Sequence, residues 1–174
     1  MKPIAILMIF ISFLAGPSWA SVDSLSPTPQ AKTANSSASL FQSAVSAYER
    51  KNYPVALKIL TELAEQGDAA AQFNLGVMYL NGEGVPRDVS QALTWYHKAA
   101  EQGNAVAQFF LGDMYRYGEG VPKDYVQAAK WLYLAKANGA AKTDEAIRQI
   151  ESMMSHQQIE QAQALATQWW QNHH

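Results

Sequence analysis

The chain has 174 residues, a formal net charge of −2 at pH 7 and no cysteine. The lack of cysteine excludes disulfides, thiolate metal sites, a cysteine nucleophile and a lipid-modified N-terminal cysteine. Its 13 lysines and arginines are scattered along the chain, whereas a nucleic-acid surface or an anionic-membrane surface needs them grouped. Neither nucleic acid nor a membrane surface is therefore an expected partner.

The first twenty residues have the pattern of a secretory signal peptide. Lys2 supplies a positive start, residues 4–15 form an apolar run, and Ser18-Trp19-Ala20 is a small-x-small cleavage site. A membrane-spanning helix needs about 20 apolar residues, and Gly16-Pro17 ends this run early. We expect cleavage after residue 20, a periplasmic or secreted protein that is not a lipoprotein, and no membrane span in the mature chain.

Residues 21–39 are rich in Ser, Pro, Thr and Ala and offer little to bury, so a disordered linker is expected there. A shortened helix pair is predicted over residues 40–66. Its first helix carries Phe41, Val45 and Tyr48 on one face, and Pro54 begins its second helix.

Residues 67–102 and 103–138 are two copies of one pattern, with 19 of 36 positions identical. A repeat of this length indicates stacked helix pairs. Each copy reads as a helix A, a Gly-Glu-Gly-Val-Pro loop, and a helix B capped by Asp88 or Asp124. Gly76 and Gly112 stand within helix A, where glycine costs about 1 kcal/mol relative to alanine. We infer that the partner helix approaches closely at both.

Residues 139–170 are predicted to form a degenerate fourth helix pair that caps the open end of the stack. Trp169 and Trp170 are expected to fold back onto that stack. The sequence thus predicts an all-α fold, an α-α solenoid of about four antiparallel helix pairs over residues 40–170. A monomer is expected.

A longer motif links the two copies to a known family. The pattern A-x-x-x-L-G-x-x-Y-x-x-G-x-G-V-x-x-D-x-x-x-A-x-x-W-x-x-x-A occurs at residues 71–99 and again at 107–135. It resembles the Sel-1-like repeat, a relative of the tetratricopeptide repeat. The resemblance implies a non-enzymatic adaptor of the bacterial cell envelope that binds a protein or a peptide, without a cofactor.

Two alternatives to a peptide-binding adaptor remain open. Some secreted, cysteine-rich members of the family are linked to β-lactam hydrolysis, but this chain lacks those cysteines and the S-x-x-K motif. The other alternative is a scaffold that self-associates by end-to-end stacking. We predict no catalytic or metal site, since phosphate-binding loops and paired histidines at metal-ligand spacing are absent from the sequence. Glu83 and Glu119 are interpreted as repeated loop residues.

The candidate binding residues are the helix A positions at which the two copies differ. They fall on one face, beside the buried face, and comprise Asn74, Val77, Leu80 and Asn81 in the first copy and Phe110, Asp113, Arg116 and Tyr117 in the second. In helical-repeat solenoids this face lines the concave groove that usually binds the ligand. The second copy offers aromatic and arginine side chains typical of peptide-binding sites. Ordinary surface variation is the alternative explanation.

Overall fold

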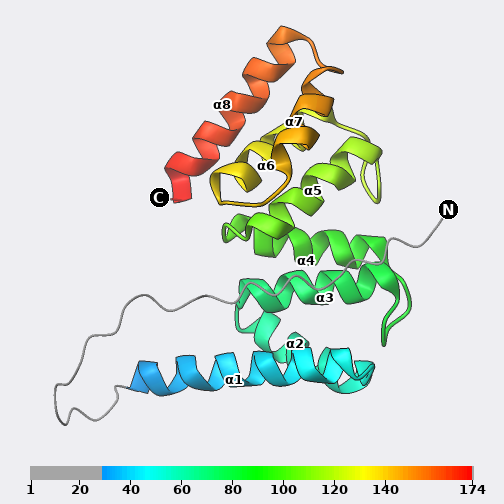
Figure 1. Ribbon diagram of the computed structural model, residues 1–174, viewed down its shortest axis with the longest axis vertical. Helices are drawn as coiled ribbons and strands as arrows, with labels where there is room; N and C mark the ends of the chain where they lie inside the picture. Colours follow the sequence, from blue (N-terminus) through cyan, green and yellow to red (C-terminus); the bar gives the residue numbers. More distant parts are fainter. Residues whose placement is uncertain (1–28, 174) are drawn as a thin grey trace.

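The computed structural model describes residues 29–173, which form eight helices and no strand (Figure 1). The helices are α1 Pro29–Glu49, α2 Tyr53–Glu65, α3 Ala69–Asn81, α4 Val89–Glu101, α5 Ala105–Tyr117, α6 Tyr125–Ala137, α7 Thr143–Glu151 and α8 His156–His173. None of them is long and apolar enough to cross a bilayer. The predicted signal peptide at residues 1–20 lies outside the described residues.

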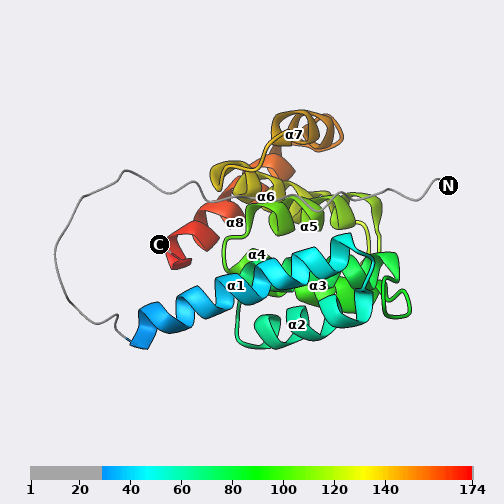
Figure 2. The ribbon, with the colours of Figure 1, turned by 60° about the horizontal axis from the view of Figure 1, so that its bottom comes forward.

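The first helix is longer than predicted. It begins at Pro29, and Figure 2 shows it extending past the end of α2. Proline suits the first turn of a helix, and residues 30–39 contain neither glycine nor a further proline. The prediction of a disordered linker over residues 21–39 therefore does not hold at residues 29–39, and residues 21–28 lie outside the described part of the chain.

Helices α1 to α6 form the regular part of the solenoid. α1 pairs with α2, α3 with α4 and α5 with α6, and each pair stacks on the next through the α2–α3 and α4–α5 contacts. The predicted caps are confirmed. Asp88 and Asp124 each accept a hydrogen bond 3.0 Å long, from the backbone N–H of Gln91 and Gln127 respectively. The all-α solenoid is confirmed as well.

The glycines within helix A mark the closest helix contacts. A Cβ atom at Gly76 would lie 2.7 Å from the Tyr96 ring, and one at Gly112 would lie 2.8 Å from Leu132 Cγ. Both distances are too short for real atoms, so a side chain at either glycine would displace the Tyr96 or Leu132 side chain that packs against helix A. The inference of close approach is confirmed.

The last two helices do not form a regular fourth pair. α8 begins as predicted, with the Ser155 backbone N–H donating to Gln158 Oε1 at 2.9 Å. It then packs along α6, which also contacts α7, and α8 makes few contacts with α7. The Trp169 ring lies near that of Trp131, and its Nε1–H donates to Glu101 Oε2 of α4 at 2.6 Å. The terminal helix α8 therefore packs across the side of the stack, where it contacts α6 and reaches Glu101 of α4.

Candidate binding surfaces

Two of the eight predicted binding residues are buried. Asn74 is 8 % exposed, and its amide donates to the backbone carbonyl of Ala70 on its own helix. Val77 is fully buried among the residues that join the two repeats, including Tyr96 and Leu111. The prediction that these two side chains line a ligand groove is wrong, because the second repeat packs onto this part of α3.

Phe110 also has a structural role. Its ring centroid lies 5.5 Å from that of Phe73 and 5.6 Å from that of Tyr96. The Phe110 side chain thus packs α5 against the preceding helix pair. Replacing Phe110 would loosen the contact between repeats in addition to any effect on a ligand.

Leu80 and Asn81 lie at the end of α3 and are partly exposed. Leu80 packs against the core between the repeats. The Asn81 amide donates to Glu83 Oε2, which also accepts from the Tyr48 hydroxyl at 2.5 Å. In the next loop, Glu119 pairs with Arg87 at 3.1 Å. Each loop carboxylate thus contacts the preceding unit, and the two carboxylates serve as links between units.

The remaining three predicted residues lie together on α5, and we call them the Tyr117 patch (Asp113, Arg116 and Tyr117). The Arg116 guanidinium lies 3.3 Å from Asp113 Oδ1 and donates to Gln149 Oε1 of α7 at 3.0 Å. It also lies 4.3 Å from the centre of the Tyr117 ring and donates to the Tyr117 hydroxyl. Arg116 therefore links α5 to α7.

Exposure differs sharply within the Tyr117 patch. The Arg116 side chain is 11 % exposed, whereas Tyr117 is 63 % exposed. Burial raises the pKa of the Asp113 carboxyl, and the neighbouring Arg116 charge opposes this effect. Tyr117 is thus a large aromatic side chain that is held on the surface by a mostly buried cation and is available to a partner.

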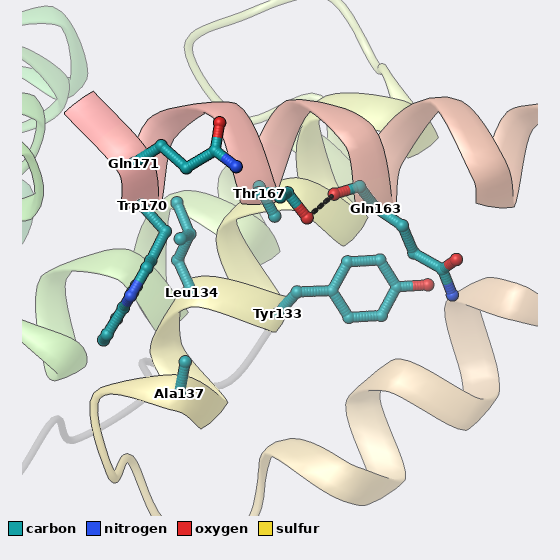
Figure 3. A pocket seen from close by; sticks show the side chains of 8 residues that line it. Tyr133, Leu134, Ala137, Gln163, Thr167, Trp170 and Gln171 are labelled. Carbon is teal, nitrogen blue, oxygen red and sulfur yellow. Dashed lines mark hydrogen bonds between the residues drawn. The ribbon is translucent and has the colours of Figure 1, made fainter. Parts of the chain in front are cut away.

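A second surface lies between α6 and α8, where the helices leave an open cavity of about 400 Å³ (Figure 3). Its lining comes from two helices: Tyr133, Leu134 and Ala137 of α6, and Gln163, Ala166, Thr167, Trp170 and Gln171 of α8. This cavity was not predicted from the sequence. The signal was present in helix B, where Lys98 and Glu101 of the first repeat become Leu134 and Ala137 in the second.

The histidines of the described chain act as packing and pairing residues. The His97 ring lies edge-on to Trp131, and its Nε2 lies 3.3 Å from the Tyr115 hydroxyl. Burial lowers the pKa of His97. His173 Nε2 lies 3.4 Å from Glu101 Oε2. Among residues 29–173, no group of three or more His, Asp or Glu side chains could hold a metal ion.

Comparison with known proteins identifies the repeats. The family model for the Sel1 repeat matches residues 69–104 and 105–139. A protective antigen present in uropathogenic Escherichia coli strains, which displays an SLR fold, is 34 % identical with a TM-score of 0.72, over 82 % of this chain and 33 % of that chain. A Sel1 repeat protein from Oxalobacter formigenes is 34 % identical with a TM-score of 0.61, over 69 % of this chain and 49 % of that chain.

The chain thus spans between a third and a half of the length of these two proteins. A search of curated proteins gave no match.

Proposed function

We propose, from the premise that the chain contains two Sel1 repeats, that it is a non-enzymatic protein-binding module of the bacterial cell envelope. Proteins with this repeat are typically protein-interaction modules. The observation that carries the proposal is the exposure of Tyr117 beside Arg116. Tyrosine and arginine are among the residues that contribute most to binding at protein interfaces.

The Tyr117 patch is suited to a peptide segment because it is already ordered. Arg116 is fixed by Asp113 and Gln149, and it in turn orients the Tyr117 ring. A partner therefore does not have to immobilise these side chains, which otherwise costs about 0.5–1.5 kcal/mol for each one. The aromatic ring would bury apolar surface, while the Asp113 carboxylate, partly exposed at its edge, would accept a hydrogen bond from the peptide.

Site-specific photo-cross-linking tests this proposal. A benzophenone amino acid is placed at Tyr117 or, as a control, at Gln91, which is exposed on α4, and the bacteria are irradiated. We expect a discrete cross-linked protein from position 117 alone. Equal cross-linking from both positions, or none from position 117, would rule out the Tyr117 patch as the binding surface.

The location in the envelope rests on the signal-peptide pattern at residues 1–20. The similar E. coli protein is a protective antigen, which supports export. An alkaline phosphatase fusion after residue 30 tests the proposal, since this reporter is active only outside the cytoplasm. We expect an active fusion and a mature N-terminus at Ser21 by mass spectrometry. An inactive fusion that retains Met1 would contradict export.

A further inference from the structure

We propose that the cavity between α6 and α8 is a second binding site, which accepts an apolar side chain from an uncharged peptide segment. The site lies on helix B and the C-terminal helix and shares no residue with the Tyr117 patch. It depends on the proposed function in one respect only, namely that the ligand is a peptide.

The lining of the cavity carries no charge. None of its eight side chains is charged at neutral pH, and burial raises the pKa of the Tyr133 phenol above its usual value. Leu134, Ala137 and Ala166 supply aliphatic surface, and the ring of Trp170 lies at one end (Figure 3). A charged group that entered this space would lose water without gaining an opposite charge. The site therefore favours an uncharged, apolar group.

The polar atoms of the lining also suit a peptide. The Tyr133 hydroxyl donates to Glu151 Oε1 at 2.6 Å, and the Thr167 hydroxyl donates to the Gln163 backbone carbonyl at 2.9 Å. The side-chain amides of Gln163 and Gln171 lie towards opposite ends of the cavity (Figure 3). A primary amide both donates and accepts, as a peptide group does. Two such groups flanking an apolar floor match the backbone on either side of one inserted side chain.

The size of the cavity and its place in the repeat are consistent with a binding site. Its volume of about 400 Å³ falls within the range of about 300–1,000 Å³ found for ligand pockets. Leu134 and Ala137 occupy the helix B positions that carry Lys98 and Glu101 in the preceding repeat. The corresponding face of α4 is charged and exposed. The apolar character is therefore particular to the place where α8 crosses α6.

Titration by two-dimensional ¹H–¹⁵N NMR of the labelled mature chain tests the inference. The probes are the N-acetyl N-methylamides of leucine, phenylalanine and glutamate. We expect saturable shifts of the backbone amides of Ala137, Thr167 and Gln171 with the leucine and phenylalanine probes, and none with the glutamate probe. No saturable shift around the cavity, or equal binding of the glutamate probe, would overturn the proposal.

The variant Ala137→Glu places a carboxylate at the cavity, and helix B tolerates this residue because Glu65 and Glu101 occupy equivalent positions. We expect about tenfold weaker binding of the apolar probes, while the control Ala141→Glu, outside the cavity and exposed, leaves binding unchanged. Thr167→Glu introduces the same charge from α8 and should have the same effect. Unchanged binding in both cavity variants would overturn the site.

The variant Tyr117→Ala separates this inference from the proposed function. It should abolish co-purification of the envelope partner with the affinity-tagged chain and leave the probe titration unchanged. If cavity binding fails while the partner is still captured at position 117, only the inference in this section is lost. If partner capture fails while the cavity still binds its probes, only the Tyr117 patch is lost.

Discussion

The outward faces of α4 and α6 are the same helix B surface in two successive repeats, yet they have different neighbours. The face of α4 is polar, with Ser90, Thr94, Lys98 and Glu101, and the corresponding residues of α6 are Val126, Lys130, Leu134 and Ala137. α8 packs along α6. α8 thus packs on the helix B face that carries Leu134 and Ala137 in place of Lys98 and Glu101.

The motif tryptophans Trp95 of α4 and Trp131 of α6 differ in exposure, as their two helix faces do. Each ring has a lysine ammonium group 4.1 Å from its centre, Lys98 over Trp95 and Lys130 over Trp131. Trp131 is 1 % exposed and lies beside Trp169, whereas Trp95 is partly exposed. The motif tryptophan thus has two environments in one chain.

The largest expected effect comes from truncating the two tryptophans. Trp131→Ala should lower the free energy of unfolding by about 3–5 kcal/mol, because it opens a cavity under α8. Trp95→Ala should cost clearly less, since its ring already meets solvent. Urea unfolding followed by circular dichroism measures both. Equal losses would show that α8 does not distinguish the two environments.

Exchanging the residues that distinguish the helix B faces should give the next largest effect. Leu134→Lys removes a buried side chain from the α6–α8 contact and brings a charge to it, so we expect a loss of about 2–3 kcal/mol. The reciprocal change, Lys98→Leu, should alter stability by less than about 0.5 kcal/mol. Thermal unfolding of the two variants measures this difference in stability. A neutral Leu134→Lys would mean that α8 is held by other contacts.

A smaller effect is expected at the carboxylate that receives α8. Glu101→Ala removes the acceptor of the Trp169 Nε1–H and the partner of His173, at a cost of about 1–2 kcal/mol. Its repeat equivalent Glu65 is exposed, so Glu65→Ala should be nearly neutral. Amide hydrogen exchange in α8 provides the most direct measurement. If the amide protection of α8 is unchanged in Glu101→Ala, Glu101 does not hold α8 in place.

The smallest effect concerns pH. Burial lowers the pKa of His97, so the folded state binds a proton at this site less readily than the unfolded state. Its contribution to stability is therefore present above the unfolded value of about 6.5 and is lost as the pH falls below it. Between pH 7.5 and about 5.5, unfolding of the wild type should become easier than that of His97→Gln, when each is compared with its own value at pH 7.5. Parallel pH profiles would contradict this.

The parts of the fold that depend on local rules were predictable from the sequence. Asp88 and Asp124 form caps and Gly76 and Gly112 lie at close contacts, because capping and glycine sterics act within one helix pair and recur in both copies. Asn74 and Val77 were assigned to a groove and are buried instead. How closely one repeat approaches the next depends on side chains such as Phe110 from outside the pair, which periodicity does not report.

The position of α8 was beyond the sequence analysis for a related reason. The helix, its Ser155 cap and the inward folding of Trp169 follow from the local pattern, but the packing of α8 on α6 rather than on the adjacent α7 is a tertiary contact. Comparing Lys98 with Leu134 shows that the face of α6 is more apolar than that of α4. Of the two candidate surfaces, the Tyr117 patch on helix A was predicted from the sequence. The α6–α8 cavity was not, because it exists only where α8 packs against α6.

The loops between helices A and B have a mechanical consequence. Tyr48 bonds to Glu83, and Arg87 pairs with Glu119, so consecutive units are tied along the edge of the stack where these loops lie (Figure 1). The first tie is part-buried, whereas the second is a solvent-exposed ion pair, a type that typically contributes about 0–1 kcal/mol and weakens with salt. Bending of the solenoid should therefore be greatest at the contact between the two full repeats. This contact should become more flexible as the ionic strength rises.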